Sequence, residues 1–201
     1  MPDAITPEVG TPTHGVVVLA AGASSRLRCN KLLLQHEGET LVRRAVRIAI
    51  ATAPRDTAIV LGAEADAVFA EVCDLPIHRV DCANWRAGMG ASLFAGLAAL
   101  SNECAGALIV VCDQPALTAS HLLALCAAWC ASPNNAAASF YADRLGVPAL
   151  LPRAWFSGLS AHGDHGAREL FAERCTQISA VPNEALALDI DREEDLVALR
   201  E

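Results

Sequence analysis

The sequence lacks any apolar run long enough to cross a bilayer, and its N-terminal segment has prolines at positions 2, 7 and 12 instead of a basic end followed by an apolar block. A surplus of positive charge is also missing. The formal net charge of -8 at pH 7 argues against a nucleic-acid-binding surface and against an anionic membrane partner. We therefore expect a cytoplasmic protein with no nucleic-acid partner and no membrane partner.

No Cys-x-x-Cys pair occurs among the eight cysteines, and the chain is too large to depend on a disulfide framework. Reduced thiols are therefore expected. One arrangement resembles a metal clip, because Cys126 and Cys130 are one helical turn apart and His121 lies just upstream. Leucines surround these residues, which favours the alternative that both cysteines are small buried hydrophobic side chains.

Length and composition indicate one globular domain. The 201 residues are enough for one sizeable core and too few for two domains with a linker. Hydrophobic residues make up 53% of the chain and charged residues 19%, which excludes a disordered protein. We expect a disordered tail over residues 1–15 and a single domain over residues 16–201.

The most informative stretch is residues 16–31, VVVLAAGASSRLRCNK. Its apolar start is typical of a strand buried on both faces in a parallel sheet. The small residues at 20–25 let the backbone approach a ligand closely and offer amide hydrogens to an anion. Arg26 and Lys31 add the positive charge that a triphosphate requires, and Cys29 lies in the same loop. The alternative is an ordinary strand-to-helix connection with solvated basic residues.

Strand and helix patterns alternate along the rest of the chain. Thr40 and Thr118 are predicted to cap two of the helices. This alternation predicts a three-layer, doubly wound α/β fold with a mostly parallel sheet, in which ligands bind at the carboxyl ends of the strands. The predicted strands are 16–19, 57–61, 77–80, 107–112, 136–141, 147–151 and 185–190, and the predicted helices are 40–52, 64–72, 91–100, 118–129 and one that starts at 192.

Carboxylates follow two of the predicted strands. Asp113 comes directly after the apolar strand 107–112, so it is expected at the same rim as the small-residue loop. Asp189 and Asp191 are two residues apart at the end of a predicted strand, and one of them is a candidate second metal ligand. Mg²⁺ needs few carboxylates when phosphates supply further oxygens, so these residues predict Mg²⁺ as a cofactor. The alternative for Asp113 is a turn or helix-capping aspartate.

Five short motifs extend along the chain. Leu19, Ala20, Ala21, Gly22, Arg26 and Lys31 match L-A-A-G-x-x-x-R-M-G-x-x-K; Asn84, Trp85, Gly88, Met89, Ser92 and Leu93 match a motif ending in G-M-x-x-S-L; Asp113, Gln114 and Pro115 match D-Q-P; Gly146 and Pro148 match G-x-P; and Gly163, Asp164, Gly166, Ala167 and Arg168 match G-D-x-G-A-R. In this order they resemble the MobA-like nucleotidyltransferases, which have a Rossmann-like nucleotidyltransferase fold, and among them most closely the molybdenum cofactor cytidylyltransferases. The double alanine resembles that of enzymes that use CTP.

The resemblance and the residue types around the small-residue loop together predict the site residues, of which Ser24, Gly62 and His165 lie outside the matched positions. For Ser92 the alternative is a small residue inside a packed helix. The predicted catalytic residues are Arg26, Lys31 and Asp113; the nucleotide-binding residues are Leu19, Ala20, Ala21, Gly22, Ser24, Arg26, Lys31, Gly62, Ser92 and Asp113; the Mg²⁺ ligands are Asp113 and Asp191; and the acceptor-binding residues are Gln114, Asp164, His165 and Arg168. Leu27 and Arg28 stand where the family has methionine and glycine, so the phosphate loop carries an extra side chain and an extra charge.

The resemblance also implies a reaction in which CMP is transferred from CTP to the terminal phosphate of molybdenum cofactor (molybdopterin) and pyrophosphate is released. CTP and molybdenum cofactor are then the small-molecule partners, and a molybdoenzyme receives the product. Two alternatives stay open. One is a guanylyl- or other nucleotidyltransferase acting on a different phosphorylated acceptor, and the other is a non-catalytic carrier or maturation factor for the cofactor. The joint presence of Lys31, Asp113 and Asp191 favours catalysis.

Overall fold

A computed structural model describes residues 12–24, 27, 29–159 and 167–199 of the chain. Within those ranges, no helix combines the length and the apolar character that a membrane span requires.

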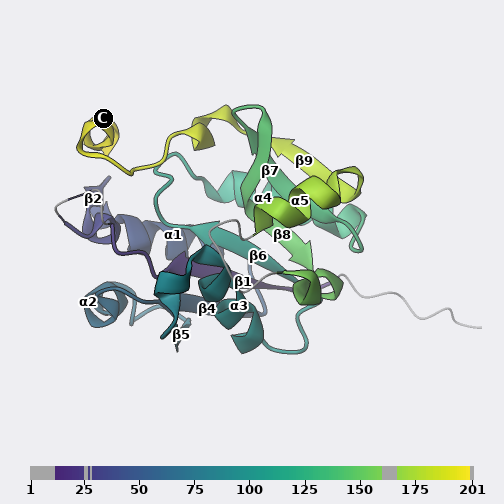
Figure 1. Ribbon diagram of the computed structural model, residues 1–201, viewed down its shortest axis with the longest axis horizontal. Coiled ribbons are helices and arrows are strands. Elements are labelled where there is room, and N and C mark those ends of the chain that lie inside the picture. The colour runs from purple at the N-terminus through teal and green to yellow at the C-terminus, as the bar shows by residue number, and fades with distance from the viewer. Residues whose placement is uncertain (1–11, 25–26, 28, 160–166, 200–201) are drawn as a thin grey trace, which may run out of the picture.

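A seven-stranded sheet forms the centre of the molecule (Figure 1). Its strand order is β5-β4-β1-β6-β8-β7-β9, and β8 is antiparallel to both of its neighbours. The other neighbouring strands run parallel, which confirms the predicted mostly parallel sheet. The strands are β1 (His14–Ala20), β4 (Asp56–Leu61), β5 (His78–Asp81), β6 (Gly106–Val111), β7 (Ala136–Tyr141), β8 (Arg144–Pro152) and β9 (Ile178–Pro182), and a small separate sheet pairs β2 (Gln35–His36) with β3 (Glu39–Thr40).

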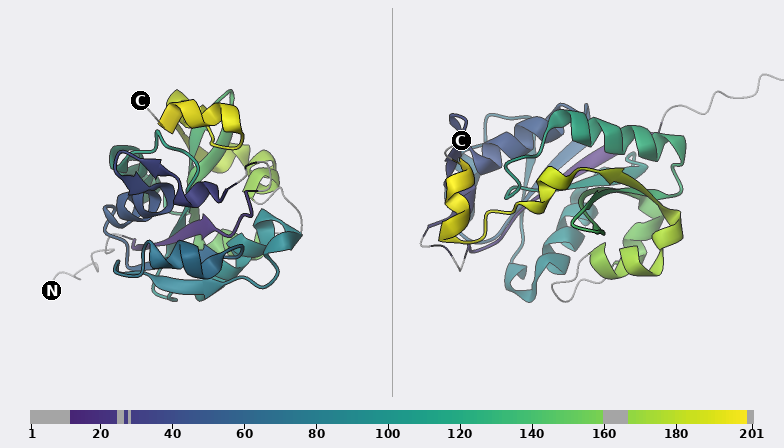
Figure 2. Two further views of the ribbon diagram at one scale, coloured as in Figure 1. Left: turned by 90° about the vertical axis from the view of Figure 1, so that its left-hand side faces the viewer. Right: turned by 90° about the horizontal axis from the view of Figure 1, so that it is seen from above.

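Helices cover both faces of the large sheet, which confirms the three-layer α/β architecture. Figure 2 shows α1 and α4 on one face and α3 and α5 on the other. The α-helices are α1 (Leu41–Ile50), α2 (Ala65–Ala70), α3 (Met89–Ala99), α4 (Ala119–Ala131) and α5 (Ala167–Glu173). The 3-10 helices are η1 (Lys31–Leu33), η2 (Trp85–Ala87), η3 (Arg153–Gly158), η4 (Cys175–Gln177), η5 (Glu184–Ala187) and η6 (Glu193–Leu199).

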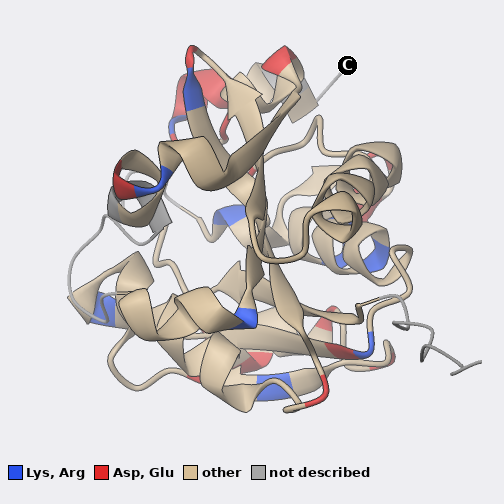
Figure 3. Cartoon of the chain, turned by 90° about the vertical axis from the view of Figure 1, so that its right-hand side faces the viewer, with Lys and Arg blue, Asp and Glu red and all other residues tan. Residues whose placement is uncertain are grey.

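The apolar strands are buried because the sheet separates two cores. In β1, Val16 and Val18 face the core beneath α1 and α4, whereas Val17 faces the core beneath α3. All three valines are fully buried, which explains why the strand reads as a continuous apolar run. Neither β1 nor β6 carries a charged residue, and charges gather on the outer elements (Figure 3).

Two predicted caps begin their helices as expected. The Thr40 side chain accepts a hydrogen bond from Arg43 N at the start of α1, and the Thr118 side chain accepts one from His121 N at the start of α4. Each threonine satisfies a backbone amide that has no partner within its helix.

The structure corrects the predicted boundaries at both ends of the domain. β1 begins at His14, so residues 14 and 15, which the prediction assigned to the tail, belong to the sheet. The predicted strand 185–190 is wrong, because η5 occupies its first part and the chain then runs extended without a ladder. The closing helix is the 3-10 helix η6, and the sheet edge is formed instead by β9, which the sequence pattern did not reveal.

The cysteines are reduced, as predicted, since all eight are free. His121 Nε2 lies 2.8 Å from Ser139 Oγ, so this imidazole nitrogen is engaged away from the two cysteines of its helix. In the described part of the chain, no group of three or more His, Cys, Asp or Glu side chains is arranged to hold a metal. The buried-hydrophobe interpretation of Cys126 is confirmed, because that side chain packs in the core beneath α1 and α4.

Gly96 determines how closely α3 approaches the sheet. A Cβ on Gly96 would contact Val17 Cγ1 and would lie 2.8 Å from Val60 Cγ2. We expect Gly96→Ala to lower the free energy of unfolding by about 1 to 2 kcal/mol, because overpacking outweighs the gain in helix propensity. Urea denaturation followed by circular dichroism measures this change. Gly158→Ala is the matched control, since its Cβ would meet no atom closer than 3.7 Å; equal effects of the two substitutions would contradict the prediction.

Candidate functional site

The loop after β1 is held in shape by its own small residues. Ala63 N donates a hydrogen bond to Ala21 O at 3.2 Å, which joins the loop to the segment that follows β4. Ser24 has a φ of 49° and accepts a hydrogen bond at Oγ from Lys31 N at 3.0 Å. Ser24 and Lys31 are therefore joined directly, and Lys31 starts η1 from a fixed backbone position.

Gly62 allows the β4 end to lie against this loop. A Cβ on Gly62 would come within 2.6 Å of both Ala21 O and Trp85 Cγ, so only glycine fits between them. Ser92 is buried, and its Oγ lies 3.9 Å from Cys82 Sγ. These contacts give Gly62 and Ser92 packing roles at the edge of the loop, and their predicted contacts with a nucleotide base stay predictions.

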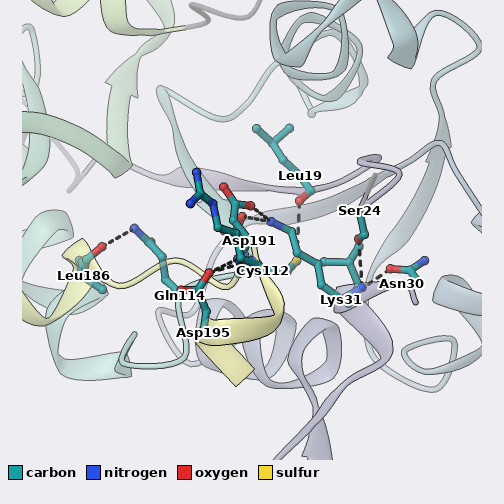
Figure 4. A network of polar contacts seen from close by, with 12 residues as sticks. Leu19, Ser24, Asn30, Lys31, Cys112, Gln114, Leu186, Asp191 and Asp195 are labelled. Carbon is teal, nitrogen blue, oxygen red and sulfur yellow. Dashed lines mark hydrogen bonds and ion pairs between the residues drawn. The ribbon is translucent and has the colours of Figure 1, made fainter. Parts of the chain in front are cut away.

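Lys31 joins the two predicted metal ligands. Its Nζ donates to Asp113 Oδ2 and to Asp191 Oδ1, each at 2.7 Å (Figure 4). These distances are typical of strong charge-assisted hydrogen bonds. The Lys31 side chain is 14% exposed, the Asp113 side chain 24% and the Asp191 side chain 47%, so the cluster opens toward solvent on the Asp191 side. The structure thus brings together residues that are far apart in the sequence.

Asp191 reaches this position through the burial of its neighbour. Ile190 is fully buried and packs with Leu27 and Leu41, while its backbone N donates to Asp113 O at 2.9 Å. Figure 1 shows the C-terminal segment crossing back beside β2 and α1. The apolar residue therefore anchors the segment that carries the second carboxylate.

Asp195 fixes the turn that carries Asp191, a role that the sequence analysis missed. Its Oδ2 accepts hydrogen bonds from Asp191 N at 2.9 Å and from Arg192 N at 2.8 Å. These backbone hydrogen bonds lower the pKa of the Asp195 carboxyl. The available signal was an acidic residue in the first turn of a helix, where a carboxylate often reaches back to preceding amides.

Gln114 lies behind the carboxylates and is buried. Its Nε2 shares two hydrogens among three acceptors, which are Leu186 O at 3.1 Å and, at 3.3 Å each, Val147 O and the hydroxyl of Tyr141. The Tyr141 hydroxyl itself donates to Val147 O at 2.9 Å. Gln114 therefore ties the end of β6 to β7, β8 and η5. This geometry gives it a positioning role, and its predicted contact with the acceptor stays a prediction.

The neighbouring carboxylates act on the pKa values of Lys31 and Asp189. Burial lowers the pKa of Lys31, but Asp113 and Asp191 together outweigh burial, so the net shift is upward and the ammonium stays charged. Burial, with the charges of Asp113 and Asp191, raises the pKa of Asp189 to about 6. Of the two candidates for the second ligand, Asp191 is the one that contacts Lys31, and Asp189 lies within reach of the same field.

The carboxylate pair fits a hard divalent cation. Two carboxylates converge on one cationic atom, and oxygen ligands of this kind suit Mg²⁺ or Mn²⁺. The described residues offer no third carboxylate, histidine or cysteine in the same group. A metal held here would therefore take its remaining ligands from phosphates or water, as Mg²⁺ commonly does in nucleotide sites.

Several predicted site residues are not among the contacts described above. Arg26, Arg28, Asp164 and His165 are outside the described residues. Arg168 lies in the first turn of α5, and the structure describes its backbone only. Cys29, which lies in the loop before η1, is exposed.

Comparison with known proteins gives one match that extends over most of the chain. A sequence profile described as the MobA-like NTP transferase domain matches residues 16–178. Nicotine blue oxidoreductase from Paenarthrobacter nicotinovorans is 41% identical over 103 residues, which are 51% of this chain and 50% of that protein. The match thus spans about half the length of this curated relative.

Solved structures agree with this match. Rv0371c from Mycobacterium tuberculosis superposes with a TM-score of 0.80 at 26% identity, over 94% of this chain and 98% of that one. A manganese complex of the same protein has a TM-score of 0.75 at 25% identity, over 93% of this chain and 97% of that one. Mth528, a nucleotidyl transferase from Methanothermobacter, shares the fold with a TM-score of 0.78 at 19% identity, over 94% and 96% of the two chains.

The Asp189 carboxyl makes stability depend on pH. Its folded-state pKa of about 6 is above the usual value near 4, so the folded state binds the carboxyl proton more tightly than the unfolded state does. The stability that this proton gives is fully present below pH 4 and is lost as the pH rises through 6. We expect Asp189→Asn to unfold at a higher temperature than the native chain at pH 8, and the difference to close at pH 4. Calorimetry with a chelator present measures both. The control substitution is Asp143→Asn in the exposed β7–β8 turn; a gap that is independent of pH would contradict the prediction.

Proposed function

The chain belongs to the MobA-like NTP transferase family, and on this premise we propose that it transfers CMP from CTP to the terminal phosphate of molybdenum cofactor and releases pyrophosphate. The observation that carries the proposal is the meeting of Lys31 with Asp113 and Asp191 beside a loop of small residues. A basic loop facing two carboxylates is what a nucleotide triphosphate and a divalent metal need together. A protein that only carried a cofactor would need no such pair.

The proposed reaction needs no protein nucleophile. An oxygen of the acceptor's terminal phosphate forms a bond to the α-phosphorus of CTP, the bond from that phosphorus to the bridging oxygen breaks, and pyrophosphate leaves with the electron pair. The backbone amides of Ala21 to Ser24 would hold the leaving phosphates, and Lys31 would neutralise the charge that develops on them. Asp113 and Asp191 would hold Mg²⁺ or another divalent ion, which when bound supplies further neutralisation at the reacting phosphate.

Specificity for CTP and for the acceptor rests on sequence features. The alanines at positions 20 and 21 support CTP, and Arg26, Asp164, His165 and Arg168 supply groups for phosphates of the nucleotide and of the acceptor. The manganese complex of Rv0371c supports a divalent metal in the family. A cytoplasmic location and a molybdoenzyme that receives the product belong to the same proposal.

A second candidate is an oxidoreductase, favoured by the 41% identity to nicotine blue oxidoreductase. The two candidates differ in what they consume. A nucleotidyltransferase releases pyrophosphate from a triphosphate, whereas an oxidoreductase consumes a reductant such as NADH or NADPH without releasing pyrophosphate. Measuring pyrophosphate and NAD(P)H absorbance in parallel separates the two.

We expect CTP with Mg²⁺ to raise the unfolding temperature. A nucleotide at about 100 times its dissociation constant adds ~2.7 kcal/mol, which is roughly 5 to 10 °C for a chain of this size. Thermal scans with CTP, GTP, ATP and UTP, each with Mg²⁺ and with chelator, measure the shift. Selectivity for GTP would transfer the proposal to a guanylyltransferase, and the absence of a shift with all four would favour a non-catalytic carrier.

Asp113→Asn should lower turnover by ~10² to 10³ while the fold persists, because removing one well-placed electrostatic group has an effect of this size on rate. The measurement is pyrophosphate release with CTP and molybdopterin, together with circular dichroism to verify folding. Asp143→Asn, at an exposed turn, provides the matched control for the same chemical change. Normal turnover in the Asp113 variant would refute its proposed role as a metal ligand.

A further inference from the structure

Lys31 contacts the carboxylates of Asp113 and Asp191, which are also the predicted ligands of a metal. Its ammonium is 2.7 Å from one oxygen of Asp113 and 2.7 Å from one oxygen of Asp191. A divalent ion such as Mg²⁺ lies about 2.0 to 2.1 Å from its carboxylate oxygens. An ammonium and a dication that shared these two carboxylates would therefore lie only a few Å apart, where like charges repel strongly in a partly buried site. A dication bound to these carboxylates would therefore be opposed by the ammonium while Lys31 stays on them.

We propose that Lys31 is an internal competitor of the divalent metal for Asp113 and Asp191, and that a nucleotide triphosphate releases this competition by drawing the ammonium onto its phosphates. The inference rests on the proposed nucleotide-binding function. Metal and nucleotide then bind cooperatively, because each favours the arrangement in which Lys31 has left the carboxylates. By linkage, the nucleotide raises the affinity for metal by the same factor as the metal raises the affinity for the nucleotide.

The backbone of Lys31 is fixed while its charge is able to move. Its N donates to Ser24 Oγ at 3.0 Å, and the preceding Asn30 caps η1 by accepting a hydrogen bond from Leu32 N. The backbone of Lys31 is thus held by Ser24 of the small-residue loop and by the capped start of η1. A four-carbon stem on a fixed root lets the ammonium exchange carboxylate partners for phosphates without moving the backbone.

The choice of lysine supports release. Lys31 is the chain's only lysine, and every other basic residue is arginine. An arginine between two carboxylates would engage them through a rigid fork of several donors, whereas an ammonium is a compact charge on a flexible stem. The single lysine is therefore placed where the cation must both bind the carboxylates and leave them.

A Mn²⁺ titration without nucleotide tests the competition. The electron paramagnetic resonance signal of free Mn²⁺ reports binding to the native chain, to Lys31→Met and to Lys31→Arg. We expect Lys31→Met to bind Mn²⁺ about 5- to 150-fold more tightly than the native chain, the usual range for coupled sites. The matched Lys31→Arg variant should stay as weak as the native chain, since it retains the cation. Equal or weaker Mn²⁺ binding by Lys31→Met would overturn the competition.

A second measurement uses the native chain and so does not depend on how a variant folds. Because Lys31 is the only lysine, protein labelled with lysine carrying ¹⁵N at Nζ gives one side-chain resonance. We expect a non-hydrolysable CTP analogue, added with chelator, to shift this resonance, and Mg²⁺ to bind more tightly afterwards by calorimetry. Nucleotide binding with an unmoved Lys31 resonance would overturn the release step.

The two experiments separate this inference from the proposed function. If no nucleotide binds the native chain, the proposed function and the release step both fail, while the Mn²⁺ titration still decides the competition. If nucleotide binds selectively but Lys31→Met gains no affinity for Mn²⁺, the proposed function stands and the competition is overturned.

Discussion

The parallel pairing of β1 with β4 and β6 is the constraint on which the site depends. The three strands run in the same direction and end at the same edge of the sheet, with Leu19 opposite Val111. The loop after β1, Gly62 after β4 and Asp113 after β6 therefore share one rim. Because all three strands are apolar and covered on both faces, burial places them in the middle of the sheet, and their paired register fixes how far Asp113 lies from the loop.

The second carboxylate depends on hydrophobic packing of another kind. Asp191 belongs to no strand, and a single backbone hydrogen bond joins its neighbour Ile190 to Asp113. Burying an isoleucine contributes about 1.5 to 3 kcal/mol, and Leu196 and Leu199 of η6 pack against the same cluster. Asp195 then orients the turn through two backbone amides. The site thus combines a rigid rim with a returning C-terminal segment that is held by apolar packing and by the ion pair of Asp191 with Lys31.

The charge arrangement links this geometry to the proposed chemistry. The whole chain is acidic, yet its carboxylates at the rim are balanced locally by Lys31, whose pKa they raise despite burial. Two carboxylates contact this one ammonium, and burial together with their negative charge raises the pKa of Asp189 to about 6. Carboxylates at the rim attract cations, and the proposed function places the phosphates of a nucleotide at the loop of small residues. Lys31 joins the two parts of the site, because its backbone contacts the loop and its ammonium contacts the carboxylates.

Much of the fold could be predicted because its signals are local: the valine run of β1, the capping threonines and the apolar strand before Asp113 each identified an element within a residue or two. The prediction was wrong at 185–190, where the pattern indicated a strand, because pairing there depends on which sheet edge is available and β9 takes it. The sequence by itself determined the mostly parallel arrangement, the apolar strands β1 and β6 and the place of Asp113 after β6. Only the tertiary structure decided that Asp113 and Asp191 meet at Lys31, because these residues are 82 and 160 positions away from Lys31 in the sequence. Only the tertiary structure decided, likewise, that Gln114 is buried, because its hydrogen bonds join separate elements of the fold. Sequence periodicity carries no information about contacts over such separations.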